Sequence, residues 1–202
     1  MIRNLIFDLG NVLISFKPSE FLKRKEYPEN KINTILSDIF YGKEWAMLDN
    51  GDISTEQAIR SISGRSSLNI AETELIFNMR KEILYPIDDN VRLLPFLKKE
   101  GFGLYYLSNF PADLFEEVKN DYYFFRHFDG GLISAEARLS KPDIRFFELF
   151  IKKFCLAPEE TLFIDDLPAN VEAASVSGMK TYLTYGSDKI ASEIFEILKI
   201  RN

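Results

Sequence analysis

The stretch LIFDLGNVLI, residues 5–14, decides the fold class. Its first three residues are apolar and are followed by Asp8 and a glycine-containing turn, a pattern typical of a buried strand that ends at a carboxylate. The same pattern recurs in LYYLSN at 104–109 and in TLFIDD at 161–166, and TYL at 181–183 predicts a fourth strand. Strands that are apolar throughout are typical of a parallel sheet buried on both faces.

Helical patterns separate these strands. We expect one helix over residues 88–101, bent near Pro95. A second begins with Pro142 in its first turn, and a third runs from Pro168 to a stop at Gly178. Alternating strands and helices predict an α/β fold built on a parallel sheet.

Residues 15–87 break this alternation. They contain no evident strand, but Ile32, Ile35 and Ile39 lie at helical spacing, and Ser54 with Gln57 forms a plausible capping box. The segment is therefore predicted to be a helical insertion between the first strand and the rest of the sheet.

Composition excludes several classes of protein. The chain has 202 residues and an ordinary globular mixture, with 46% hydrophobic and 28% charged residues, which excludes a disordered chain or a fibre. The net charge of −6 disfavours a nucleic-acid partner. No segment approaches the roughly 20 apolar residues that cross a bilayer, so we expect no membrane partner. The lone Cys155 predicts a reducing, cytoplasmic location, and its apolar neighbours predict a buried thiol.

Polar side chains follow three of the four predicted strands, and a lysine precedes a predicted helix. These residues are Asp8, Ser108, Asn109, Lys141, Asp165 and Asp166. The carboxyl ends of parallel strands form the ligand-binding edge of an open sheet. Taken singly, each residue has an ordinary explanation as a turn, cap or solvated residue. As an ordered series, they indicate a site in which carboxylates hold a hard cation such as Mg²⁺, while hydroxyl, amide and ammonium groups hold phosphate oxygens.

Four motifs carry a resemblance to a known family. FDLGNVL at 7–13, LSN at 107–109, KPD at 141–143 and FIDD at 163–166 resemble, in order and spacing, the motifs of the haloacid dehalogenase superfamily. The first motif is particularly similar to that of bacterial α-D-glucose-1-phosphate phosphatases, and the phosphatase domain of epoxide hydrolases is a further relative. The resemblance implies a Rossmann-like core, residues 1–14 and 88–202, with a helical cap, residues 15–87.

The resemblance also implies roles for individual residues. Asp8 would be the nucleophile that forms an aspartyl-phosphate, and Ser108 and Lys141 would hold the transferring phosphoryl group with help from Asn109. Mg²⁺ would be the cofactor. Its expected ligands are Asp8, the Gly10 carbonyl and Asp166, with Asp165 supporting the metal and Asn170 helping at the next turn.

One position departs from the pattern that the resemblance implies. Most phosphatases of the superfamily carry a second Asp two residues after the nucleophile, as acid for the leaving group and base for water, but here that residue is Gly10. Glu44, Asp49 and Asp52 in the insertion are candidates to replace it. Dehalogenation is disfavoured because it would leave Asp165 and Asp166 without a purpose, and a phosphomutase would need the missing group.

Three other residues have competing interpretations. His127, the only histidine, is predicted to have a structural or surface role, because it has no partner that could share a metal with it. Trp45 either lines a substrate pocket or packs the insertion's core. Arg80 is expected on a solvated helix face, with substrate contact as the alternative.

Two functions follow from this pattern. The leading hypothesis is a Mg²⁺-dependent phosphatase for a small phosphorylated metabolite, with sugar phosphates among the candidates. The alternative is a catalytically weakened relative that binds a phosphometabolite or a partner protein. The pattern does not specify an oligomeric state.

Overall fold

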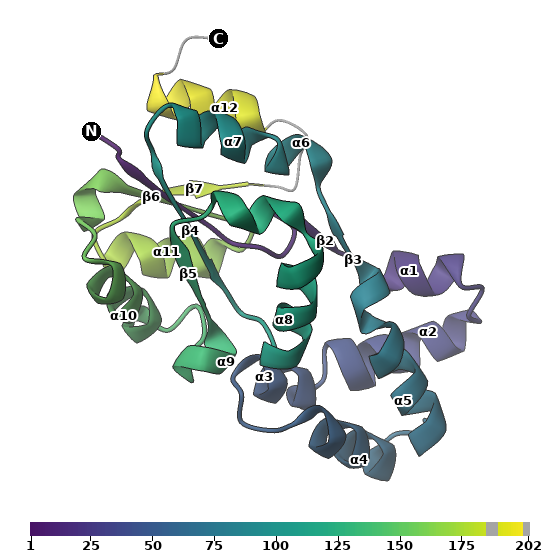
Figure 1. Ribbon diagram of the computed structural model, residues 1–202. Helices are drawn as coiled ribbons and strands as arrows, with labels where there is room; N and C mark the ends of the chain where they lie inside the picture. Colours follow the sequence, from purple (N-terminus) through teal and green to yellow (C-terminus); the bar gives the residue numbers. More distant parts are fainter. Residues whose placement is uncertain (185–189, 200–202) are drawn as a thin grey trace.

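The centre of the molecule is a five-stranded parallel sheet in the order β5-β4-β1-β6-β7 (Figure 1). A computed structural model describes residues 1–184 and 190–199. The strands are β1 (Asn4–Phe7), β4 (Gly103–Ser108), β5 (Gly130–Ile133), β6 (Thr161–Asp165) and β7 (Lys180–Leu183). The predicted α/β class is confirmed. The order runs outward from β1 in both directions, so the switch point of this doubly wound sheet lies beside β1.

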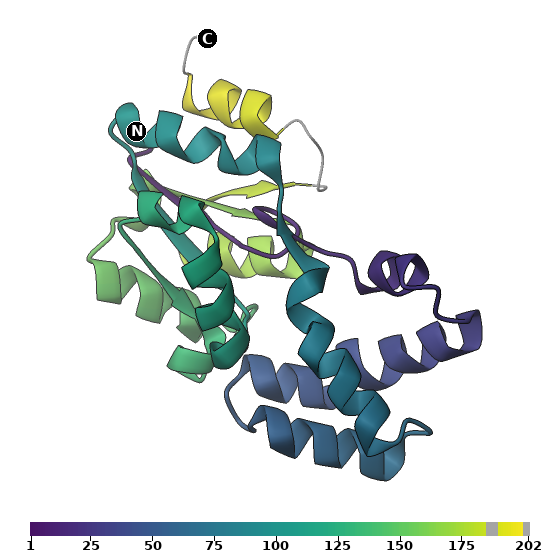
Figure 2. The same ribbon diagram turned by 45° about the vertical axis from the view of Figure 1, so that its right-hand side comes forward.

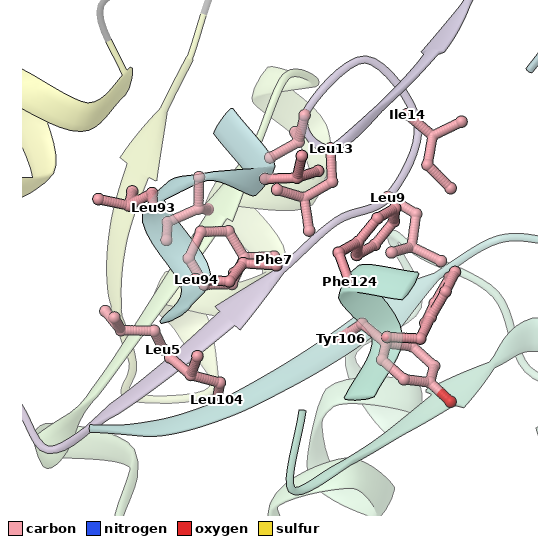
Figure 3. Close-up of a cluster of buried hydrophobic side chains, with 14 of the residues drawn as sticks. Leu5, Phe7, Leu9, Leu13, Ile14, Leu93, Leu94, Leu104, Tyr106 and Phe124 are labelled. Carbon is pink, nitrogen blue, oxygen red and sulfur yellow. The ribbon is translucent and has the colours of Figure 1, made fainter. Parts of the chain in front are cut away.

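Alternation along the strands explains the three-layer packing. In β1, Leu5 and Phe7 belong to one hydrophobic cluster, whereas Ile6 belongs to the cluster on the opposite face. Successive strand residues point to opposite faces, so a wholly apolar strand supplies two cores. Figure 3 shows Leu5 and Phe7 packed against Leu93 and Leu94.

Helices cover both faces of the sheet (Figures 1 and 2). The helices that pack with Leu5 and Phe7 are α6 (Asp88–Val91), α7 (Leu93–Lys99), α8 (Ala112–Asp121) and α12 (Ile190–Leu198), together with the 3₁₀ turn η3 (Tyr123–His127). On the opposite face lie α10 (Ile144–Phe154) and α11 (Pro168–Val176). Short connections are made by α9 (Ser134–Ala137) and the 3₁₀ turn η4 (Pro158–Glu160).

Strand β5 was not anticipated from the sequence, because it begins with two glycines. A Cβ on Gly130 would lie 2.4 Å from the Phe154 ring, and a Cβ on Gly131 would lie 2.2 Å from the Tyr106 ring. The aromatic rings therefore pack directly against this edge strand's backbone, and the glycines are required by that close approach.

Two helices differ from the expectation. The helix predicted over 88–101 is divided at Arg92 into α6 and α7, because Pro95 has no N–H to donate to the Val91 carbonyl. Pro142 is not in the first turn of α10. The helix begins at Ile144, after Asp143, whose carboxylate accepts a hydrogen bond from the Arg145 N–H.

The prediction of a buried thiol is wrong. Cys155 is exposed, because it terminates α10 in a left-handed conformation with φ of 52°. Gly178 ends α11 as predicted, with φ of 84°. In the described part of the chain, no helix has the length and apolar character needed to cross a bilayer.

The helical insertion is flanked by a short two-stranded antiparallel ribbon that was not predicted from the sequence. Strands β2 (Ile14–Phe16) and β3 (Leu84–Pro86) pair antiparallel where the chain leaves and re-enters the sheet domain. Each is only three residues long, too short for a period-2 pattern to be visible. The ribbon aligns the two connections between the insertion and the sheet.

The insertion has a hydrophobic cluster of its own, centred on residues such as Leu22, Ile35, Ile39 and Ile62. Its elements are α1 (Pro18–Arg24), α2 (Glu29–Ile35), the π-helical turn η1 (Leu36–Phe40), α3 (Lys43–Asp49), α4 (Thr55–Arg65), α5 (Ile70–Met79) and the 3₁₀ turn η2 (Arg80–Ile83). The Ser54–Gln57 capping box is present at the start of α4.

Arg80 joins the insertion to the sheet domain instead of facing solvent as expected. Its guanidinium donates to Thr55 Oγ1 at 2.9 Å and to the Asp113 carboxylate of α8 at 2.6 Å. Thr55 also donates to Asp113 at 2.7 Å. The Arg80 side chain is 8% exposed. This buried arginine therefore fixes the insertion against α8.

Replacing Arg80 with Ala is predicted to lower the free energy of unfolding by about 1–3 kcal/mol, because a charged hydrogen-bonding group is lost from a buried junction. The neighbouring Lys81 pairs with Asp121 but is 35% exposed, so Lys81→Ala is the matched control and should lower the free energy of unfolding by less than Arg80→Ala does. Urea unfolding measures both. Equal losses in the two variants would contradict the placement of Arg80.

Candidate active site

The carboxyl ends of β1 and β6 are joined by one buried ammonium group. Lys141 Nζ lies 2.8 Å from Asp8 Oδ1 and 2.6 Å from Asp165 Oδ2. The Asp8 N–H donates to the Ile164 carbonyl, which extends the pairing of the two strands up to the site. All three side chains are at least nine-tenths buried, so their charges interact with little screening.

Burial sets the protonation of this group. It raises the pKa of Asp8 to about 6, against the opposing attraction of Lys141. For Lys141 the balance is reversed: burial disfavours the ammonium, but Asp8 and Asp165 outweigh burial and raise its pKa. Lys141 is therefore a permanent cation at neutral pH. Asp8 Oδ1 also accepts a hydrogen bond from the Leu9 N–H at 2.7 Å.

The two carboxylates that end β6 differ in their surroundings. Asp165 accepts hydrogen bonds from the Leu167 N–H and from the Asn170 amide, in addition to Lys141, so both of its oxygens are occupied. Asp166 accepts one bond from the Asn11 amide at 3.3 Å and is more exposed. Burial and the charge of Asp165 raise the pKa of Asp166.

The predicted phosphate-binding residues come together at the end of β4, but they make different contacts. Ser108 is buried, and its hydroxyl favours the charged form of Asp8. Asn109 donates to the Lys141 carbonyl and accepts from the Lys141 N–H, both at 2.9 Å. Its amide therefore holds the backbone of Lys141, which positions the ammonium group.

The donor set fits a hard divalent cation. Oxygen atoms of Asp8, Asp165 and Asp166 lie within 4.8 Å of one another. Three carboxylates this close repel unless protons or a cation lie among them. Asp8 and Asp166 retain capacity for a metal, whereas Asp165 is saturated by the protein. Gly10 lines the same cavity. The β-bridge between Gly10 and Ile14 is formed by the Leu9 carbonyl and the Asn11 N–H, so it does not use the Gly10 carbonyl, which remains able to bind a metal.

A cavity of about 260 Å³ opens over these residues, bounded by both the sheet domain and the insertion. Its polar lining is Asp8, Gly10, Asn11, Asp49, Ser108, Asn109, Lys141, Asp166 and Asn170. Its apolar lining is Ile14, Phe16, Trp45, Leu84, Phe110, Pro111, Leu114 and Leu167. Trp45 fulfils both interpretations, because it lines this cavity and also stacks on Phe16 within the insertion.

The three acidic candidates from the insertion occupy different environments. Glu44 is 1% exposed and bonds to Arg65 and Ser61, and the Arg65 hydrogen bond lowers its pKa to about 2. Asp52 is exposed and accepts a hydrogen bond from Asn50. Only Asp49 lines the cavity that contains Asp8. His127, in η3, lies outside this lining.

The fold and site together define a class of protein. A doubly wound sheet whose carboxyl edge gathers Asp8, Ser108, Lys141 and an Asp pair, with helices inserted after the first strand, is the arrangement of the haloacid dehalogenase superfamily. Residues 2–178 match the family described as haloacid dehalogenase-like hydrolase, so the chain belongs to this family of hydrolases.

Two curated relatives and one solved structure illustrate the similarity within this family. A sesquiterpene phosphatase (astK) of Aspergillus oryzae is 29% identical over 174 residues, which are 86% of this chain and 85% of that protein. A phosphoserine phosphatase of Thermus thermophilus is 32% identical over 109 residues, 53% of this chain and 43% of that protein. The fold is shared with a HAD family enzyme of Bacteroides thetaiotaomicron in complex with magnesium and inorganic phosphate. That structure has a TM-score of 0.74 and 22% identity over 96% of this chain and 99% of that chain.

Removing the ammonium group is predicted to make stability strongly dependent on pH. In the metal-free protein, Lys141→Met leaves Asp8 and Asp165 buried without their cation, which costs about 3–5 kcal/mol at pH 8. The folded-state pKa of Asp8, already raised, rises further above its unfolded value, so the native state binds more protons than the unfolded state. The deficit should therefore shrink as the pH falls toward 5.

Urea unfolding of the wild type and the variant in the presence of a chelator, at pH 5 and pH 8, measures this effect. Lys152→Met, which removes an exposed lysine of α10, is the control and should be neutral at both values. A deficit for Lys141→Met that is the same at both pH values would contradict the electrostatic role.

Proposed function

We propose that the protein is a Mg²⁺-dependent phosphatase that hydrolyses a small phosphate monoester through an aspartyl-phosphate on Asp8. The observation that carries the proposal is the Asp8 carboxylate, which is buried against Lys141 and faces a cavity beside Asp166. The division into a sheet core and a helical cap belongs to this proposal, with the insertion enclosing the substrate. Phosphatases among the relatives support the reaction type.

Each group in the site has a distinct task in this reaction. Asp8 attacks phosphorus, and Ser108 and Lys141 hold the phosphoryl oxygens in line with it. Asn109 positions Lys141 through its backbone, and Asp165 holds the ammonium group from the other side. The metal is held by Asp8, Asp166 and the Gly10 carbonyl, with Asp165 in support, and when bound it neutralises charge on the phosphate.

The alternative, a binding protein without turnover, is motivated only by Gly10, which lies two residues after Asp8. A protein that merely binds a phosphate ester has no need for a buried carboxylate directed at the phosphate, because that carboxylate repels the ligand. The retention of Asp8 together with Lys141 and Asp166 therefore favours the enzyme.

The cavity walls favour an apolar organic group over a sugar. Eight apolar side chains line the cavity. The amides among the polar residues are already engaged: Asn109 with Lys141, Asn170 with Asp165, and Asn11 with Asp166 and the Phe16 N–H. Sugar hydroxyls buried here would lack partners, which is costly. The similarity to a sesquiterpene phosphatase points the same way.

The reaction itself is tested by phosphate release from an aryl phosphate. Wild-type protein should release phosphate only with Mg²⁺, and Asp8→Asn should lose essentially all turnover because the amide cannot act as the nucleophile. A thermal melt shows that the variant is folded. Turnover that persists in Asp8→Asn, or none in folded wild type with Mg²⁺, would refute the proposed function.

The substrate class is tested by comparing geranyl phosphate with glucose 1-phosphate and glucose 6-phosphate. We expect kcat/KM to be at least about tenfold higher for the apolar ester, because its chain gains from burial against the cavity wall. Leu167→Ser should reduce kcat/KM for geranyl phosphate only. Val176→Ser, at an exposed position of α11 away from the cavity lining, is the control. A higher kcat/KM for the sugar phosphates would contradict the proposed apolar substrate and favour a sugar phosphate.

A further inference from the structure

Hydrolysis of an alkyl phosphate ester needs a proton at the leaving oxygen, and the residue expected to supply it is missing. Gly10 has no side chain to donate one. A side chain at this position would not be crowded, because within the described part of the chain a Cβ built on Gly10 would meet only Asp8 Oδ2, at 3.9 Å. The space above the nucleophile is open, so a group from another element is able to enter it.

Asp49, the last residue of α3, lines the cavity together with Asp8. Its Oδ1 is shielded from solvent and has no hydrogen-bond partner among residues 1–184 and 190–199. An unpaired buried carboxyl oxygen is costly and calls for an explanation. A substrate atom in the cavity would supply the partner that the protein does not.

The position of Asp49 is fixed by the sheet domain. Its carbonyl accepts a hydrogen bond from the Ser134 hydroxyl at the start of α9, and the same Ser134 oxygen accepts from the Phe110 N–H at 2.9 Å. Two residues later, Gly51 has φ of 71°, and a Cβ there would lie 2.7 Å from the Ala135 carbonyl oxygen. The end of α3 is therefore seated tightly on the domain that carries the nucleophile.

The surroundings of Asp49 suit a group that exchanges a proton. Burial, with a further contribution from the charge of Asp8, raises the pKa of Asp49 to about 7. A carboxyl group poised near neutrality is able both to donate and to accept a proton. Glu44 is unsuited to this task because Arg65 holds it as a carboxylate, and Asp52 does not line the cavity.

We propose that Asp49, supplied by the insertion, is the general acid and base of the reaction, in place of the side chain absent at Gly10. This assignment rests on the proposed phosphatase function. In the first step, Asp8 forms a bond to phosphorus, the bond from phosphorus to the ester oxygen breaks, and that oxygen takes its electron pair and the Asp49 proton. In the second step, the Asp49 carboxylate takes a proton from water as the water oxygen attacks phosphorus. The bond to Asp8 then breaks, and inorganic phosphate leaves.

The leaving group distinguishes this role from a structural one. For Asp49→Asn, kcat/KM for an alkyl phosphate should fall by about 10²–10⁴-fold, whereas kcat/KM for 4-nitrophenyl phosphate should change by less than about threefold, because nitrophenolate leaves without a proton. Loss of the base should also slow the second step, so the variant should release a burst of nitrophenolate stoichiometric with enzyme. Asp52→Asn is the matched control and should leave both substrates unaffected.

A rescue variant tests the chemistry directly. Adding Gly10→Asp to Asp49→Asn places a carboxyl group in the open space beside Asp8, and at least about tenfold of kcat/KM for the alkyl phosphate should return. A double variant as slow as Asp49→Asn alone would count against the assignment, as would equal losses on both substrates.

The wild-type protein supplies a test that needs no variant to fold. Across esters with increasingly basic leaving groups, kcat/KM should vary little if Asp49 protonates the leaving oxygen, and a steep fall would overturn the assignment. The two proposals fail differently. Absence of any Mg²⁺-dependent release refutes the phosphatase, whereas normal release with Asp49→Asn unimpaired on alkyl phosphate refutes only the role of Asp49.

Discussion

The contact of the Lys141 ammonium with Asp8 and Asp165 is the interaction on which the rest of the site depends. It attracts both of the carboxylates that the parallel pairing of β1 and β6 brings to the same edge of the sheet, and so offsets their mutual repulsion. A buried lysine is tolerated only with such partners. Asn109, from the end of β4, fixes the backbone of the same lysine. One cation thus connects the ends of three strands with the loop before α10.

The insertion adds what the sheet edge lacks. The strand ends supply charges that suit phosphate, and the segments that follow them add Phe110, Leu114 and Leu167 to the cavity lining. The acidic residues they contribute are the clustered carboxylates. Trp45 and Phe16 give the cavity an apolar wall, and Asp49 brings a separate carboxyl group. Arg80 on Asp113, together with Gly51 against Ala135, fixes the insertion to the sheet domain at two places. In the proposed function, proton transfer depends on these contacts, specificity depends on apolar side chains of both parts, and nucleophilic attack depends on the sheet.

Much of this architecture could be predicted from the sequence, because a parallel sheet leaves strong local signals. Three apolar strands are followed by or end in Asp8, Ser108 and Asp165, and the carboxyl ends of parallel strands lie at one edge of the sheet regardless of the loops that connect them. Strand β5 could not be predicted, because its two glycines are required by contacts with the Tyr106 and Phe154 rings, which are distant in sequence. Long-range contacts of this kind leave no periodic trace. For the same reason Arg80 was expected in solvent. Cys155 was expected in the interior because its neighbours in the sequence are apolar, but it is exposed at the end of α10.

The acidic residues of the insertion illustrate the same limit. Glu44, Asp49 and Asp52 are equivalent candidates by sequence, since each is an acidic residue of the insertion. The packing of α3 against α4 and α9 separates them: Glu44 is bound to Arg65 of α4, Asp52 is exposed, and Asp49 lines the cavity. The proposed reaction itself depends on Asp8 as the nucleophile that becomes phosphorylated. Mass spectrometry of protein quenched in acid within the first turnover of an aryl phosphate should find one phosphoryl group on the peptide that contains Asp8. Phosphoryl transfer to a different residue during that turnover would contradict the account.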